Sequence, residues 1–411
     1  MKINRKISPD LKVQPNFITK KRLKEDEINF DKLRSYRLDR VKSELKKNNL
    51  EACILFDPVN VRYALDTVNM SVYNMHNLTR YCFVPVEGPV ILYEYFNCEG
   101  LSSHLNLINE IRPAITWDYF SNGDQASEQL KKWINEIKDL SNSYFKSKKV
   151  AIDVINGPAV TALNKASIDV VDAKLILEQA RVIKSAEELK CMKAAVEVAE
   201  IGVSRMRNEL KAGMTEDELW SILHKTNIEH GGEWIECRIL SSGERTNPWM
   251  QESSNKIIQS GEIVSFDTDM VGPYGYCADI SRAFVEGNKF NDEQKKLYSM
   301  AVDQINHNYR IIKPGVSFKE FTERSWTLPD EYYGNRYSVM LHGIGMCDEW
   351  PAIRYPTDGG QRNGQFEKNM TITLESYIGK VGGKEGVKLE QQYLVGENGL
   401  ELMSHHPLED I

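Results

Sequence analysis

The sequence predicts a chain of mixed α-helices and β-strands in two parts, an α/β N-terminal part and an α+β C-terminal part. Up to about residue 175, amphipathic helices alternate with short apolar strands. Two helix-start signatures then follow, Ser185-Ala-Glu-Glu188 and Thr215-Glu-Asp-Glu218. After them come apolar runs that carry acids. We therefore expect an arm over residues 1–30, an N-terminal domain over 31–180 and a C-terminal domain over 181–411.

The elements of the N-terminal part follow from periodicity. Residues 31–49 place apolar side chains at helical spacing, so they predict an amphipathic helix. An apolar run at 52–56 predicts a strand that ends in a turn at Asp57-Pro58. The runs 81–86 and 89–95 flank Glu87-Gly88 and predict a hairpin. A helix over 127–140 and a strand over 149–153 are expected to complete the unit.

Composition narrows the class of protein. The net charge of −7 over 411 residues argues against a general binder of nucleic acid or anionic membranes. No apolar run reaches the ~18 residues that span a bilayer, and the basic N-terminus lacks the apolar core of a signal peptide. The seven cysteines are scattered and form no CxxC pair. We expect reduced thiols in a cytoplasmic enzyme.

Residues 264–282 are the first stretch with a chemical signal. Two apolar runs flank a turn rich in glycine and proline, which predicts a β-hairpin. The hairpin carries Asp267, Asp269 and Asp279. Carboxylates among apolar residues are costly to bury unless a cation compensates them, and hard divalent ions take carboxylate oxygens. Taken alone, the stretch is equally compatible with three surface acids beside a turn.

Three residues downstream strengthen the metal hypothesis. His342 stands before Gly343 at a predicted strand end, while Glu375 and Glu390 each interrupt an apolar strand pattern. One acid inside a strand is usually an edge charge. Five acids and a histidine on several strands favour convergence on a metal pair, which needs about five or six such ligands.

The order of these motifs resembles the pita-bread metallopeptidase superfamily, which includes methionine aminopeptidase, prolidase, aminopeptidase P and the metal-free creatinase. The carrying residues are the hairpin Asp269-Met-Val-Gly-Pro-Tyr-Gly-Tyr-Cys-Ala-Asp279, His342-Gly-Ile-Gly, Glu375 and Glu390. The resemblance covers about residues 31–405. It implies a creatinase-like α/β N-terminal domain followed by an α+β pita-bread catalytic domain.

Two departures from the peptidase pattern bear on the chemistry. Asp267 and Asp269 lie twelve and ten residues before Asp279, and neither spacing is the usual one in the peptidases, so which of the two bridges stays open. Trp249 and Asp348 stand where the peptidases carry histidines near the scissile bond. Without groups that position a peptide and move its proton, peptide hydrolysis is disfavoured. An Xaa-Pro-type metallopeptidase or a creatinase-like hydrolase remains the alternative.

The remaining groups suit a different reaction. Asp348 is a carboxylate that can act as a base without being a ligand; a loop or cap acid is the alternative. Aromatic faces bind onium cations, which suggests substrate-binding roles for Trp249, Trp350 and Tyr337; core packing is the alternative. A metal that takes a substrate carboxylate acidifies the α-carbon. A base could then remove the α-proton and expel a β leaving group in a β-elimination.

The sequence more specifically resembles the DddP-type dimethylsulfoniopropionate lyases of marine bacteria. The carrying segments lie in both halves of the chain: 56–70, 231–252, 265–282 and 340–351. The resemblance implies a homodimer that cleaves an onium carboxylate to dimethyl sulfide and acrylate. It implies Asp348 as base, Tyr337 as a substrate contact and two ions, iron by resemblance with manganese, cobalt or zinc as alternatives. The implied ligands are Asp267, Asp269, Asp279, His342, Glu375 and Glu390.

Overall fold

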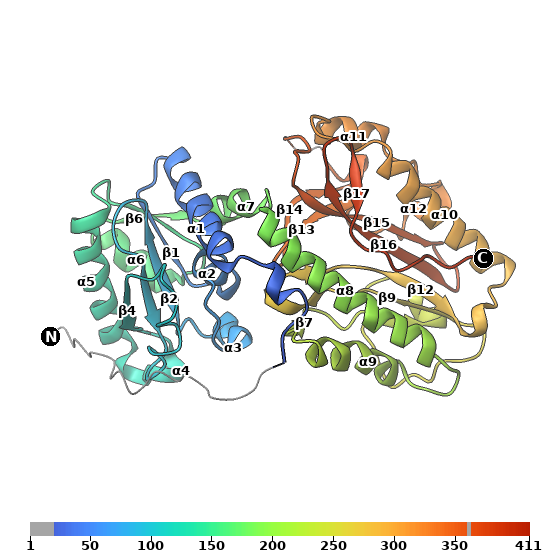
Figure 1. The fold of residues 1–411 in the computed structure, drawn as a ribbon, viewed down its shortest axis with the longest axis horizontal. Coiled ribbons are helices and arrows are strands. Elements are labelled where there is room, and N and C mark those ends of the chain that lie inside the picture. Colours follow the sequence, from blue (N-terminus) through green and yellow to red (C-terminus); the bar gives the residue numbers. More distant parts are fainter. Residues whose placement is uncertain (1–19, 360–362) are drawn as a thin grey trace. The chain divides into compact units, whose positions relative to one another are not determined.

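The computed structural model describes residues 20–359 and 363–411 (Figure 1). They form two compact units. The N-terminal unit is Phe30–Arg181 with Lys20, and the C-terminal unit is Val182–Ile411 with Lys21–Asn29. Most of the expected arm, residues 1–19, lies outside the described residues. Of the rest of it, Lys21–Asn29 belongs to the C-terminal unit, and Lys20 and Phe30 belong to the N-terminal unit.

The N-terminal unit is built on a six-stranded sheet in the order β4-β3-β2-β1-β5-β6. β2 is antiparallel to β1 and β3, and the other neighbours are parallel. Helices cover the sheet, with α5 and α6 over the face that holds the main core of this unit (Figure 1). The strands are β1 (Ala52–Leu55), β2 (Tyr81–Pro85), β3 (Ile91–Glu94), β4 (Glu110–Pro113), β5 (Lys149–Ile152) and β6 (Asp169–Asp172). The helices are α1 (Phe30–Lys47), α2 (Pro58–Leu65), α3 (Ser71–His76), α4 (Tyr119–Asn122), α5 (Ala126–Tyr144), α6 (Gly157–Lys165) and α7 (Lys174–Arg181).

The predicted helices, strands and hairpin of this unit are present, with one difference at Asp57-Pro58. These residues begin α2 rather than a simple turn. The Asp57 side chain accepts hydrogen bonds from Val59 N and Asn60 N, and Pro58 occupies the first helical turn. An aspartate cap followed by proline is a helix-start signal. The apolar core beneath is centred on aromatic residues, including the fully buried Trp133.

The C-terminal unit contains three sheets. Two have three strands, in the orders β11-β10-β7 and β12-β9-β8, and one has five, in the order β14-β13-β15-β16-β17. The strands are β7 (Trp234–Ile235), β8 (Leu240–Ser242), β9 (Ile263–Phe266), β10 (Met270–Val271), β11 (Cys277–Ala278), β12 (Arg282–Val285), β13 (Leu341–Ile344), β14 (Asp348–Ile353), β15 (Thr371–Gly379), β16 (Gly386–Val395) and β17 (Leu400–Leu402). The helices are α8 (Ala186–Glu209), α9 (Glu216–Glu229), α10 (Asp292–Tyr309), α11 (Phe318–Arg324) and α12 (Asp330–Tyr333).

Both predicted capping boxes are formed. The side chains of Ser185 and Thr215 each accept a hydrogen bond from the backbone N–H three residues on. The carboxylates of Glu188 and Glu218 in turn accept one from the backbone N–H of Ser185 and Thr215. The helices that they start, α8 and α9, pack side by side, while α10 packs across β15 and β16 (Figure 1). The strand β16 also contacts β9 and β12. It therefore joins the five-stranded sheet to the predicted hairpin.

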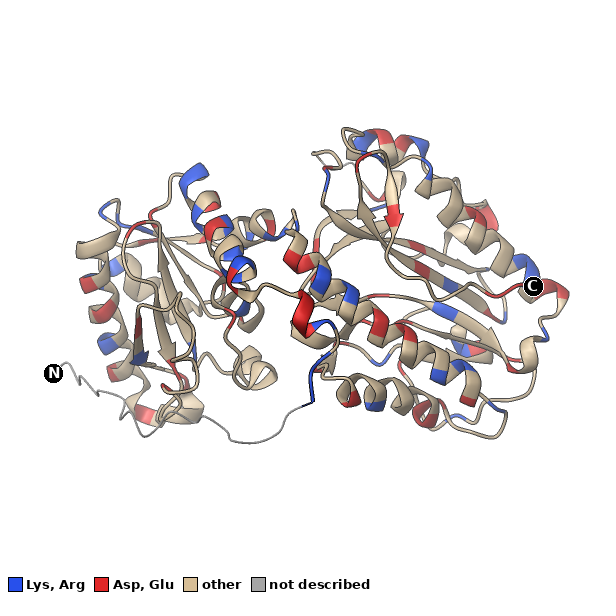
Figure 2. Ribbon diagram, in the orientation of Figure 1, with Lys and Arg blue, Asp and Glu red and all other residues tan. Residues whose placement is uncertain are grey.

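Charges of both signs are interspersed on the helices. Figure 2 shows Lys and Arg alternating with Asp and Glu along α1, α5 and α8. No described helix combines the length and apolarity needed to cross a membrane. No disulfide links any of the seven cysteines, all of which are described residues. In contrast to these exposed charges, several acids of the C-terminal unit are buried.

Candidate metal centre

The predicted hairpin is an interrupted one, and its acids lie at the interruptions. β9 pairs with β12 in one sheet, whereas β10 pairs with β11 in another. Asp267 and Asp269 lie in the gap between β9 and β10, and Asp279 lies in the gap between β11 and β12. A backbone that leaves one ladder before joining the next can turn these side chains to a common side.

Thr268 holds the gap together. Its hydroxyl donates to Ala278 O at 2.9 Å and accepts from Ile280 N at 2.9 Å. One carboxylate oxygen of Asp267 and one of Asp269 lie within 4.8 Å of each other. Asp269 has a φ of +34°, in the left-handed region that aspartate tolerates better than most residues. The DTD sequence thus presents two carboxylates together.

His342 reaches the centre from β13 through a bulge. The pairing of β13 with β14 changes register between His342 and Gly343, and such a bulge re-aims side chains. A Cβ on Gly343 would lie 2.6 Å from Trp350 O. A Cβ on Gly345 would lie 2.3 Å from the Glu349 carboxylate. The two glycines therefore allow β14 to approach closely enough to fix this corner.

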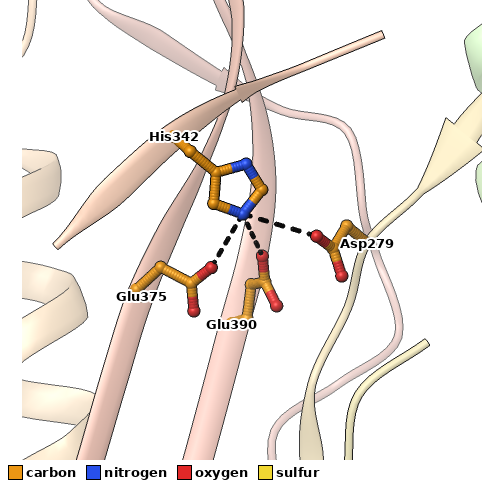
Figure 3. Close-up of side chains that lie close together, drawn as sticks. All are labelled: Asp279, His342, Glu375 and Glu390. Atoms are coloured by element: carbon orange, nitrogen blue, oxygen red, sulfur yellow. Dashed lines mark ion pairs between the residues drawn. The ribbon is translucent and has the colours of Figure 1, made fainter. Parts of the chain in front are cut away.

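Four side chains converge on one point, three from the strands β13, β15 and β16 and Asp279 from the gap between β11 and β12, as Figure 3 shows. His342 Nε2 lies 3.0 Å from Glu375 Oε1, 3.5 Å from Asp279 Oδ2 and 3.8 Å from Glu390 Oε1. One ligand atom from each of these residues lies within 4.8 Å of the others, and the same holds for Asp267, Asp269 and Asp279. Asp279 belongs to both groups. We call these six residues the six-donor cluster.

The donors shift one another's pKa. Burial, followed by the charge of neighbouring carboxylates, raises the pKa values of Asp279 and Glu390 well above their usual range. Burial and the charge of Asp267 raise the pKa of Asp269 to about 7. Burial opposes ionisation of His342, but its hydrogen bond to Glu375 and the surrounding acids raise its pKa. So many acids are held together that some retain protons until a cation replaces them.

The cluster fits a divalent metal pair. His342 Nδ1 lies 2.9 Å from Gly343 O, which fixes the Nδ1–H tautomer and leaves the Nε2 lone pair for a ligand. Asp279 Oδ1 and Glu390 Oε1 are buried and have no hydrogen-bond partner among the described residues. Buried carboxylate oxygens without partners call for a cation. Five carboxylates and one imidazole match the donors that such metals accept.

The structure adds Lys388 and Ser281, which sequence reasoning missed. Lys388 Nζ donates to Asp267 Oδ2 at 2.9 Å and to Ser281 Oγ at 2.6 Å. Ser281 Oγ in turn lies 2.9 Å from Glu390 Oε2. The available signal was the two-residue spacing of Lys388 and Glu390, which places both on one face of a strand.

Asp348 lies next to Nδ1 of the His342 ring, whereas Nε2 approaches the donors. Its Oδ1 is 3.6 Å from His342 Nδ1, and its side chain is 61% exposed. It is therefore beside the cluster without belonging to it. This is the position expected of a carboxylate that is available to a bound molecule.

The three predicted aromatic contacts separate into two groups. Lys388 Nζ lies 4.8 Å from the ring centroid of Tyr337 and 5.7 Å from that of Trp249, so both rings border the cluster. Trp350 packs edge-on against Phe318, at 5.1 Å between ring centroids, beside the apolar core. Its predicted contact with the substrate stays a prediction.

The two-unit fold and the cluster of acids around one histidine are features of a metallopeptidase-like protein. Metallopeptidase family M24 matches residues 190–397. Among solved structures, an Xaa-Pro dipeptidase from Bacillus anthracis superposes with a TM-score of 0.74 over 91% of this chain and 98% of that one, at 19% identity. At that identity the likeness concerns the fold, and it confirms the predicted pita-bread architecture.

Sequence comparison places the chain more narrowly. It is 35% identical to the dimethylsulfoniopropionate lyase DddP of Roseovarius nubinhibens, over 92% of this chain and 87% of that protein. It is 33% identical to the DddP of Roseobacter denitrificans, over 92% and 86% respectively. The chain belongs to the DddP family of dimethylsulfoniopropionate lyases, within metallopeptidase family M24.

Proposed function

We propose that this protein cleaves dimethylsulfoniopropionate to dimethyl sulfide and acrylate by β-elimination. The proposal rests on the identity to the DddP lyases over nearly the whole chain. The site observation that supports it is the arrangement around His342. Nε2 faces the donors, while the carboxylate of Asp348 lies beside Nδ1 and outside the donor set. The site thus offers a metal-binding side and a base.

The six-donor cluster would hold two divalent ions. When bound, they supply Lewis acidity that favours loss of a proton from the carbon next to a substrate carboxylate. Asp348 takes this α-proton. The electron pair of the C–H bond becomes the double bond of acrylate, and the C–S bond breaks. The sulfur keeps the electron pair of the broken C–S bond and leaves as neutral dimethyl sulfide, so the step needs neither a water nucleophile nor a redox partner.

Tyr337 and Trp249 line the aromatic side of the site. Their faces would receive the dimethylsulfonium group, which a cation–π contact favours. Trp249 also packs against Tyr377, with 5.9 Å between ring centroids, and this contact holds its plane. Trp350, which rests on Phe318, is assigned to packing instead.

The finer assignments follow from the resemblance. We propose iron as the resident metal, with manganese, cobalt and zinc as alternatives, because oxygen-rich sites with one imidazole accept all four. We further propose a homodimer in the cytoplasm of a marine bacterium. Seven cysteines that form no disulfide support a reducing compartment. Elemental analysis and light scattering of the purified protein test the metal and the dimer.

The decisive experiment is direct. Purified protein loaded with Fe²⁺ under anaerobic conditions is given dimethylsulfoniopropionate, and headspace dimethyl sulfide and dissolved acrylate are measured together. Equal amounts of both products are expected. No product from fully metallated protein would refute the lyase. Release of amino acids from Xaa-Pro dipeptides would support the hydrolase alternative, against which Trp249 and Asp348 argue.

A further inference from the structure

Lys388 is a fully buried cation inside the six-donor cluster. Its side chain is 0% exposed, and its Nζ lies 2.9 Å from Asp267 Oδ2, 2.7 Å from Glu375 Oε2 and 3.1 Å from Glu390 Oε2. The hydroxyl of Ser281 is a fourth neighbour, at 2.6 Å. The ammonium therefore touches three of the five carboxylates that the metal pair would need.

Strand geometry explains how one side chain reaches all three. Lys388 and Glu390 share a face of β16, and Glu390 stands directly opposite Glu375 on β15. The backbone N–H of Lys388 donates to Ser265 Oγ, which fixes β16 against the hairpin strand that leads to Asp267. The ammonium thus sits where the cross-strand pair of glutamates meets the hairpin.

The charges explain what such a lysine does. Like charges directly opposite on neighbouring strands are destabilising, and buried carboxylates without compensation are costly. The cluster contains five carboxylates, and Lys388 contributes one positive charge. The four negative charges that remain equal the charge of two divalent ions. A neutral residue at this position would leave the filled site with a net negative charge.

We propose that Lys388 is the organising cation of the metal centre: it holds Asp267, Glu375 and Glu390 in their ligating arrangement before metal binds and, with two divalent ions, balances the five carboxylates. The inference rests on the metal centre of the proposed function and adds a positioning residue to it. Lys388 also connects the cluster to the aromatic side of the site, because its Nζ lies 4.8 Å from the ring centroid of Tyr337.

The experiment measures thermal unfolding with and without metal. Lys388→Met keeps the length of the side chain and removes its charge, while Lys388→Arg keeps the charge. Each protein is prepared metal-free and loaded with Mn²⁺. In the metal-free form Lys388→Met is expected to lower Tm by on the order of 10 °C, because buried carboxylates lose their partner. In the Mn²⁺-loaded form the decrease in Tm of Lys388→Met should be less than half as large. Lys388→Arg should lower Tm less than Lys388→Met in both forms.

Lys184→Met is the matched control. Lys184 Nζ is also buried and lies 2.7 Å from Glu349 Oε2, a carboxylate outside the cluster. This variant should lower Tm equally with and without Mn²⁺. The same equal loss in Lys388→Met would overturn the proposal, because it is the behaviour of a lysine that only supports the fold.

A charge-restoring pair covers the case in which Lys388→Met does not fold. Asp267→Asn combined with Lys388→Met removes one charge of each sign. The metal-free double variant should recover at least half of the Tm lost by Lys388→Met, or fold where that variant does not. Failure to recover would contradict the proposal. None of these measurements uses dimethylsulfoniopropionate. A protein that binds Mn²⁺ but makes no dimethyl sulfide would therefore refute the lyase alone, and a wild type that binds no metal would refute both.

Discussion

Asp348 lies beside the imidazole of His342, with its carboxylate nearest to Nδ1 rather than to the Nε2 atom that approaches the metal donors. The 3.6 Å between Asp348 Oδ1 and His342 Nδ1 is too long for a hydrogen bond, and Nδ1 instead lies 2.9 Å from Gly343 O. Asp348 is thus close to the metal centre but is not one of its ligands. The separation of a held ligand from a free carboxylate is the basis of the proposed division between metal binding and proton abstraction.

Replacing Asp348 by Asn should remove the base and leave the centre intact. We expect the rate of dimethyl sulfide release to fall by about 10²–10⁴-fold, which is the usual contribution of a general base. Because the side chain is mostly exposed, Tm and metal content should stay near wild type. Gas chromatography of the headspace and elemental analysis provide the two readouts. A loss of metal that parallels the loss of activity would instead make Asp348 a ligand.

Replacing Glu390 by Gln should also abolish activity, but through loss of the bound metal. Burial and neighbouring acids raise the pKa of Glu390, which favours the protonated carboxyl that a glutamine amide mimics. We expect Tm of the metal-free variant to stay within about 3 °C of wild type. Metal content and dimethyl sulfide release should fall to background. A large loss of Tm in the metal-free variant would show that Glu390 is ionised there.

The metal-free protein should be less stable at pH 8 than at pH 5. The pKa of Asp269 is raised to about 7, so folding favours its protonated form, and stability falls as the pH rises from the ordinary value near 4 towards 7. The raised pKa of His342 acts in the same direction, because its stabilisation is fully present below its ordinary pKa and is lost as the pH rises. The raised pKa values of Asp279 and Glu390 add to this trend.

Metal should reverse the trend, because ions take the place of the protons. We therefore expect the Tm difference between Mn²⁺-loaded and metal-free protein to grow from pH 5 to pH 8. Differential scanning fluorimetry at three pH values measures it. Comparing the two forms cancels groups outside the centre, such as His406, whose pKa burial lowers to about 4. A difference that does not change with pH would contradict the assigned shifts.

Trp249 and Trp350 should respond differently to the loss of their aromatic faces. Trp249→Leu should lower kcat/KM for dimethylsulfoniopropionate by about 3- to 30-fold, the range of a desolvated cation–π contact, and Trp249→Phe should lower it less. Trp350→Leu should lower Tm through its contact with Phe318 and leave kcat/KM near wild type. Equal effects of the two leucine variants on kcat/KM would remove Trp249 from the substrate site.

The sequence was sufficient to predict the longer helices and to single out the acids and the histidine of the cluster. The capping boxes at Ser185 and Thr215 are local signals, and they form as predicted. The acids could be singled out because each interrupts an apolar pattern, which is rare without a partner. The interruption of the hairpin was not visible, because it depends on which ladder each half joins. The same limit applies to the bulge at His342, which arises from pairing with β14.

Lys388 shows why part of the site was missed. A lysine inside a strand usually marks an edge, where its charge reaches water. Here β16 is a central strand of its sheet, and the face that carries Lys388 is covered by the hairpin strands.

Trp350 was assigned to the substrate by its place in a motif. Its packing against Phe318 depends on a contact across 32 residues that no local pattern reveals.

The gap that Thr268 spans gives this family a degree of evolutionary freedom. The donors Asp267, Asp269 and Asp279 lie between paired segments, so a residue gained or lost there need not shift the register of any sheet. The number of carboxylates offered to the metals, and their order along the chain, can then change while both ladders persist. Related proteins that share the fold could have arrived at different donor spacings, and hence at different chemistry, without rebuilding the scaffold.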